Sequence, residues 1–169
     1  MSFLTGPMNH HLDGQKELTK HEPVLKSIDP EYVWVPLACN ASVFVPLVEV
    51  GDEVKVGQKI AERNDHFYVP VFSSVSGTVT AIEKFMTSAM TPADHLKIQN
   101  DHKYEAVKSF ETIDYEKASW EELLEFVKTS GMVGLGGAGF PTYVKYQKPE
   151  NVDLFIINAV ECEPFLTAE

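Results

Sequence analysis

The chain has 169 residues, of which 44% are hydrophobic, and carries a formal net charge of −11 with a sequence pI near 4.9. Nucleic acids and anionic membrane surfaces select for Lys and Arg, so a chain this acidic is a poor partner for either. Its longest apolar run, Val43 to Val50, contains Pro46 and Glu49 and is far shorter than the ~20 residues of a membrane span. Cys39 and Cys162 are too few for a disulfide framework, and the N-terminus lacks the basic segment of a secretory signal. We therefore expect a cytoplasmic, reduced protein with no direct membrane span.

Residues 1–29 form a polar stretch with no clear periodicity. His10 and His11 are adjacent, and neighbouring side chains of a strand point to opposite faces. No cysteine or acidic pair completes a metal site around them, so we predict a solvated N-terminal arm.

Residues 30–115 are predicted to form an all-β domain. The runs rich in β-branched and aromatic residues are 32–37, 42–50, 67–72 and 78–82. Gly51-Asp52, Gly57-Gln58 and Ser76-Gly77 are turn signals between them. Pro36, Pro46 and Pro70 lie in or at the ends of runs, which predicts edge strands or bends there.

The pattern of residues 50–61 followed by 74–82 resembles a biotinyl/lipoyl-type barrel-sandwich hybrid. Carrier domains of that fold present a modified lysine at the tip of a hairpin between the two halves. The corresponding tip here, residues 62–66, contains no lysine. We therefore reject a carrier function and predict a structural or docking module.

Residues 84–118 are less informative. The segment from His95 to Gln99 alternates weakly between polar and apolar residues, as an edge strand would. His95 and His102 are isolated histidines, and we expect both at the surface.

Residues 119–130 predict a helix. Ser119 and Glu122 make a capping box. The apolar side chains recur at helical spacing along one face, at positions 120, 123, 124 and 127. Gly131 is a typical stop after the last turn.

The next stretch is rich in glycine, with Gly131, Gly134, Gly136, Gly137 and Gly139 close together. Glycines let another group approach the backbone, and successive N–H groups can form an anion-binding concavity. Pro141 favours the first position of a helix, whose N-terminus would add to a phosphate site. A flexible connector is the alternative, but connectors are rich in Ser and polar residues and this loop is apolar.

Beyond the loop, residues 141–148 predict a short helix or turn that carries Lys145. Residues 152–157 are almost continuously apolar and predict a strand buried on both faces. Residues 158–163 leave its C-terminal end, where ligands of open α/β sheets tend to bind. One helix, a loop and one strand are too little for a complete α/β domain, so residues 116–169 are predicted to be its N-terminal part.

Residues 134–139 also fit the G-x-G-x-x-G pattern of a dinucleotide-binding Rossmann fold. That motif requires a strand before the loop and a helix after it. Here a capped helix comes first, so a Rossmann nicotinamide site is the poorer interpretation.

GLGGAGFPT at 134–142, Lys145, and INAVECEP at 157–164 together resemble the flavin-site motifs of the RnfC family. That family is the soluble, NADH-facing subunit of the Rnf ion-pumping electron-transport complex. A variant of the same motif pair occurs in the flavin-binding subunit of respiratory complex I, where an aspartate replaces Val160. The resemblance is dense over residues 131–169 and continuous, though weaker, over about 15–85.

The resemblance implies a role for each matching residue. Backbone N–H groups from Gly136 to Gly139 would hold the phosphate of FMN, Lys145 would add positive charge, and Phe140 would form a wall. The full set of implied cofactor-binding residues is Gly134, Gly136, Gly137, Ala138, Gly139, Phe140, Lys145, Asn158, Glu161 and Glu163. Asn158 would hydrogen-bond the flavin, and Glu161 and Glu163 would line the pocket. Solvated positions for Lys145 and both glutamates, and plain core packing for Phe140, stay open as alternatives.

Taken together, we expect an α+β protein: an N-terminal barrel-sandwich hybrid followed by the start of an α/β FMN-binding domain. The resemblance implies an electron-transfer subunit that uses FMN, with NADH as substrate and other complex subunits as partners, peripheral to the inner face of the cell membrane. The family's [4Fe-4S] clusters need C-x-x-C-x-x-C runs that this sequence lacks, so we expect a fragment or truncated homologue that is inactive alone. The alternatives are a docking module without catalysis, or an RnfC-like protein of a soluble amino-acid reductase system.

Overall fold

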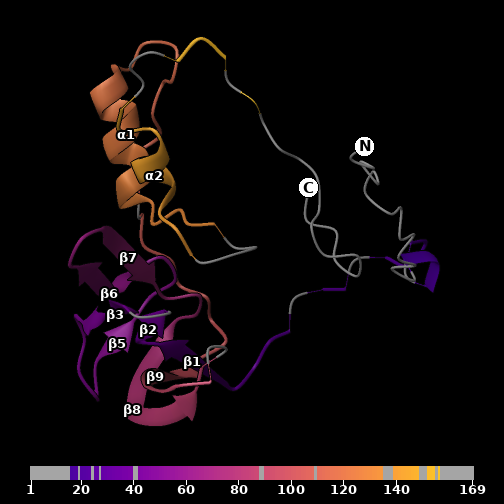
Figure 1. Cartoon of the computed structure of the whole chain (residues 1–169). Helices are drawn as coiled ribbons and strands as arrows, with labels where there is room; N and C mark the ends of the chain where they lie inside the picture. The colour runs from indigo at the N-terminus through magenta and orange to yellow at the C-terminus, as the bar shows by residue number, and fades with distance from the viewer. Residues whose placement is uncertain are drawn as a thin grey trace, which may run out of the picture. The chain divides into compact units, whose positions relative to one another are not determined.

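The computed structural model describes residues 16–18, 20–23, 25–26, 28–39, 42–87, 90–108, 110–134, 139–148, 152–154 and 156. The chain divides into two units, residues 28–150 and a second unit made of 1–27 and 151–169. In the first unit the strands gather into a barrel. Helices α1 (Trp120–Thr129) and α2 (Thr142–Lys145) lie beside each other near β7 (Tyr68–Phe72) (Figure 1).

The largest sheet of the barrel is antiparallel and has the strand order β1-β9-β8-β5. Its strands are β1 (Tyr32–Pro36), β9 (Pro92–Asn100), β8 (Gly77–Met86) and β5 (Glu53–Val54). Its inner face packs the core around Val79, Leu96 and Ile98, which are inaccessible to solvent. The register of β8 against β9 shifts between Val79 and Ala81, an irregularity of the kind that a β-bulge introduces.

A second sheet of order β4-β6-β7 closes the other side. Its strands are β4 (Val45–Pro46), β6 (Lys59–Asn64) and β7 (Tyr68–Phe72), and a small ribbon joins β2 (Ala38–Cys39) to β3 (Ser42–Val43). Pro36, Pro46 and Pro70 all lie in edge strands, as predicted, because proline has no N–H to donate to a neighbouring strand. This β-rich architecture confirms the predicted barrel-sandwich fold.

The prediction for residues 95–99 was wrong. They lie in β9, which is a central strand paired with both β1 and β8. His95 is also buried, with 8% of its surface exposed, and its ring packs edge-on against Phe85 at 5.6 Å. Weak alternation of polar and apolar residues shows which side chains share a face of the sheet. It does not show whether a strand has one neighbouring strand or two. His102 is half-exposed, in line with the prediction for that residue.

The predicted helix is present as α1 (Trp120–Thr129), and its capping box forms as expected. The Ser119 hydroxyl accepts the Glu122 N–H at 3.2 Å, and the Glu122 carboxylate accepts the Ser119 N–H at 2.8 Å. Gly131 follows in the left-handed region at φ 72°. A single helical turn, α2 (Thr142–Lys145), comes after the glycine-rich loop.

In the second unit the described residues include a short 3-10 helix, η1 (Lys16–Leu18), and no strand at 152–154 or 156. The strand predicted at 152–157 is therefore absent where the structure describes it, and Leu154 and Ile156 are exposed. A strand needs neighbours to pair its N–H and C=O groups, and no described segment pairs with these residues. No helix in the described part of the chain is long and apolar enough to cross a membrane.

Candidate functional site

The glycine-rich loop is closed at its base by backbone hydrogen bonds. The Gly134 N–H donates to the Phe140 carbonyl at 3.0 Å, and the Thr142 N–H donates to the Met132 carbonyl at 2.9 Å. Val133 and Pro141 form an antiparallel bridge between these two bonds. The two ends of the loop are therefore fixed against each other before any ligand is considered.

The two glycines at the ends of this loop differ in their surroundings. Gly139 has φ 65°, and a Cβ added there would lie 3.0 Å from the Cys39 Sγ atom of β2. Glycine is thus favoured at 139 by both conformation and space. At Gly134 the nearest described atom to an added Cβ is the Phe140 carbonyl oxygen at 3.9 Å, an ordinary van der Waals distance, so contacts with the described residues do not require glycine there.

Phe140 leaves the loop with its ring partly in solvent, at 41% exposure. The ring makes an edge-to-face contact with Phe67 of the β6–β7 turn, with centroids 5.4 Å apart. The remaining exposed surface is compatible with a pocket wall, and the Phe67 contact shows that Phe140 also packs against protein.

Lys145 is the last residue of α2 and is exposed. Pro141 is the N-cap residue of α2 instead of its first helical residue. Because α2 has only four residues, its dipole adds little to an anion site. A phosphate site here would therefore depend on N–H groups of the loop and on the Lys145 ammonium group, as the sequence predicts.

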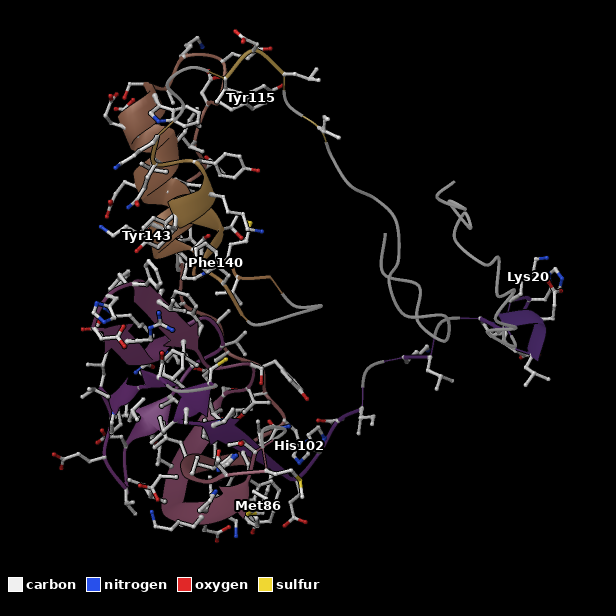
Figure 2. The ribbon with its side chains drawn as sticks, in the orientation of Figure 1. Lys20, Met86, His102, Tyr115, Phe140 and Tyr143 are labelled. Carbon is white, nitrogen blue, oxygen red and sulfur yellow. The ribbon has the colours of Figure 1, made fainter. Side chains whose placement is uncertain are left out.

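The hairpin made by β6 and β7 packs against both ends of the loop segment. The Tyr68 N–H donates to the hydroxyl of Tyr143, a buried residue of α2, at 3.1 Å. On the other side, a Cβ at Gly131 would lie 2.8 Å from the Pro70 carbonyl oxygen. Figure 2 shows Phe140 and Tyr143 at the junction between the helices and the barrel.

Several residues of the predicted site lie outside the described part of the chain: Gly136, Gly137, Ala138, Asn158, Glu161 and Glu163. Their roles stay predictions. Of the other implied residues, the structure brings Gly134, Gly139 and Phe140 together, and places Lys145 one helical turn beyond them.

The contacts between the barrel and this loop segment were not predicted from the sequence. Phe67, Tyr68 and Cys39 contact the loop segment from positions far away in the sequence. The one available signal was the aromatic pair Phe67-Tyr68 directly after the tip where carrier domains have their lysine.

The described residues agree with the phosphate end of FMN in two respects. The glycine-rich loop is closed at its base, and the exposed Lys145 places a cation on the helix that follows it. The chain thus combines a barrel-sandwich hybrid with a capped helix and a closed glycine-rich loop. This combination defines a class of protein in which a β module precedes the beginning of a flavin domain.

The chain belongs to the RnfC family. Residues 7–103 match the family model described as the RnfC barrel sandwich hybrid domain. Residues 127–169 match the model of the Nuo51 FMN-binding domain. The match to the second model covers both predicted flavin-site motifs.

Curated relatives agree with this assignment. The C subunit of the proton-translocating ferredoxin:NAD(+) oxidoreductase complex of Clostridium ljungdahlii is 34% identical over 163 residues, covering 94% of this chain and 36% of the relative. Its counterpart in the Na(+)-translocating ferredoxin:NAD(+) oxidoreductase complex of Acetobacterium woodii is 34% identical over 165 residues, covering 94% and 37%. The counterpart in the ion-translocating oxidoreductase complex of Vibrio cholerae is 31% identical over 167 residues, covering 96% and 22%. The chain thus spans between 22% and 37% of the length of these relatives.

Proposed function

We propose that this chain is part of an electron-transfer subunit that passes electrons between NADH, FMN and iron–sulfur centres in a membrane-associated oxidoreductase complex. The observation that carries the proposal is the glycine-rich loop closed by the Gly134–Phe140 hydrogen bond, within a segment that matches an FMN-binding domain model. FMN, when bound, supplies the chemistry that couples two-electron hydride transfer to one-electron carriers.

The chain's own residues position this cofactor. N–H groups of Gly136, Gly137, Ala138 and Gly139 hold the phosphate, and Lys145 offsets its charge. Gly134 closes the loop and Phe140 flanks the ligand. Asn158 hydrogen-bonds the flavin, and Glu161 and Glu163 line the side at which NADH arrives.

The domain limits follow the same proposal. Residues 1–29 are the arm, residues 30–115 the barrel-sandwich domain and residues 116–169 the first part of the flavin domain. With cysteines only at positions 39 and 162, this sequence offers no [4Fe-4S] ligand set, so other polypeptide of the complex would hold those clusters. The relatives are named as parts of multi-subunit complexes, so the partners are the other proteins of such a complex, at the cytoplasmic face of the membrane.

A docking module is the second candidate function, and one surface favours it. The outer face of the β1-β9-β8 sheet exposes Trp34 (40%) and Phe85 (46%), whose rings meet edge to face at 6.0 Å. Exposed aromatic clusters are enriched in protein interfaces. This function does not require flavin binding.

Titration of the purified chain with FMN, followed by quenching of flavin fluorescence, separates the two functions. The electron-transfer proposal predicts saturable binding that is lost in Gly137→Trp, because an indole side chain would fill the phosphate loop. Ser74→Trp, at an exposed position of the barrel, is the matched control and should bind as the wild type does. An absence of saturable binding would leave the docking function.

A further inference from the structure

We propose that the β6–β7 hairpin of the barrel holds the two ends of the glycine-rich loop in place, and that Tyr143 is the positioning residue through which it acts. This inference rests on the proposed flavin function for its ligand readout. It assigns a role to the barrel, whose hairpin tip carries no lysine for a prosthetic group.

The first contact is the hydrogen bond from the Tyr68 N–H to the Tyr143 hydroxyl at 3.1 Å. β7 is an edge strand of its sheet, so its outward N–H groups need partners from outside the sheet. Tyr143 supplies one while only 6% of its surface is exposed. The bond therefore joins the barrel edge to the helix that directly follows the loop.

The second contact fixes the residue that leaves the loop. Phe67 lies in the β6–β7 turn and packs edge-on against Phe140 at 5.4 Å. Phe67 is itself held by the Arg63 guanidinium, 5.4 Å from its ring centroid. The Nε atom of Arg63 in turn donates to Asp65 in the same turn at 2.8 Å. The hairpin tip is thus an internally bonded surface against which Phe140 rests.

The third contact is on the opposite side of the loop. Gly131 approaches the Pro70 carbonyl so closely that a Cβ would lie 2.8 Å from its oxygen. The Lys128 ammonium group of α1 lies 5.7 Å from the ring centroid of Tyr68. The segments before and after the loop therefore rest on the same hairpin.

Fixing the two ends of a loop lowers the entropy that ordering it around a ligand costs, and preorganised sites bind more tightly for that reason. Loosening the hairpin contact should weaken the binding of the phosphate part of a ligand more than the binding of its ring.

The test uses Tyr143→Phe, which removes the hydroxyl and keeps the ring, with Tyr115→Phe as the control at a residue that is 73% exposed. The first readout needs no ligand: amide hydrogen exchange of Gly134 and Thr142, whose N–H groups close the loop base. We expect these amides to exchange about fivefold faster in Tyr143→Phe, the effect of losing a typical hydrogen bond, with the β9 amides unchanged. Unchanged exchange at Gly134 and Thr142 would overturn the proposal.

The second readout is the ratio of the FMN to the riboflavin dissociation constant. We expect Tyr143→Phe to weaken FMN binding about fivefold relative to riboflavin, and Tyr115→Phe to leave the ratio unchanged. General destabilisation of the chain would weaken both ligands equally and would contradict a positioning role. Phe67→Leu is the second variant and should shift both readouts in the same direction. If the wild-type chain binds no FMN, the proposed function fails, while the exchange rates still decide whether the hairpin holds the loop.

Discussion

The Gly134 amide donates to the Phe140 carbonyl at 3.0 Å and thereby joins the two ends of the glycine-rich segment. The bond occupies the Gly134 N–H group, so the phosphate site that we propose would take its donors from residues after Gly134. It also places Phe140, which contacts the Phe67 ring of the barrel, at the base of the loop.

Gly139→Ala should disturb this loop for two separable reasons. An alanine at φ 65° costs about 1–2 kcal/mol in backbone energy. Its Cβ would also press on the Cys39 Sγ atom, 3.0 Å away. The double variant Gly139→Ala, Cys39→Gly should recover only the part of the lost unfolding free energy that comes from the clash with the Cys39 Sγ atom. Urea unfolding of the single and double variants measures the two parts, and a double variant as unstable as the sum of the singles would contradict the contact.

Gly77→Ala should be among the most damaging single changes in the barrel. A Cβ there would lie 1.8 Å from the Gln99 carbonyl oxygen of the neighbouring strand, so β8 and β9 could not keep their present separation. We expect a loss of at least about 3 kcal/mol in the free energy of unfolding.

Gly51→Ala is the matched control for that change. Its φ of 103° is also unfavourable for alanine, but no atom of the described residues lies within 4 Å of the added Cβ. It should cost only the backbone term of about 1–2 kcal/mol. Equal losses for the two variants in thermal or urea unfolding would show that close approach of the strands is not what requires Gly77.

Ser119→Ala should destabilise α1 by about 1 kcal/mol, because the Glu122 N–H loses the hydroxyl oxygen that it now bonds at 3.2 Å. The change should appear as a lower midpoint in thermal unfolding followed by helical circular dichroism. Ser74→Ala, at an exposed barrel position, should leave the midpoint unchanged. An unchanged midpoint for Ser119→Ala would show that tertiary contacts alone hold the helix.

Acid should weaken the barrel through Asp101. The Ser76 hydroxyl and the Lys103 N–H donate to its carboxylate and hold its pKa below the ordinary value of 3.8. Because the folded-state pKa is lowered, the stabilisation is fully present above the unfolded value and is lost as the pH falls through the folded pKa.

Urea unfolding at several pH values measures this effect. Asp101→Asn should lower stability at neutral pH and should flatten the dependence of stability on pH below about 4, relative to the wild type. A variant with the wild-type slope in acid would show that Asp101 does not contribute to it.

Local signals predicted part of this structure well. The capping box at Ser119 and Glu122 involves residues close in sequence, so the sequence pattern alone was sufficient to predict where α1 begins. The prolines marked edge strands for an equally local reason, the missing N–H group.

Other features depend on contacts between distant parts of the chain. The bond between Tyr68 and Tyr143 joins residues 75 positions apart, and no periodicity indicates such a partner. Alternation at 95–99 gave the buried face of β9 but not its two neighbours. The apolar run at 152–157 predicted a strand, although the described residues there have no strand to pair with.

The most direct test of the account is a calorimetric comparison of FMN with riboflavin, which lacks the phosphate. If the loop after Gly134 holds the phosphate, FMN should bind at least about tenfold more tightly than riboflavin, as expected for charge-assisted hydrogen bonds. This preference should disappear in Gly137→Trp. Equal affinities for the two flavins, or an FMN preference that survives Gly137→Trp, would contradict a phosphate site in this loop.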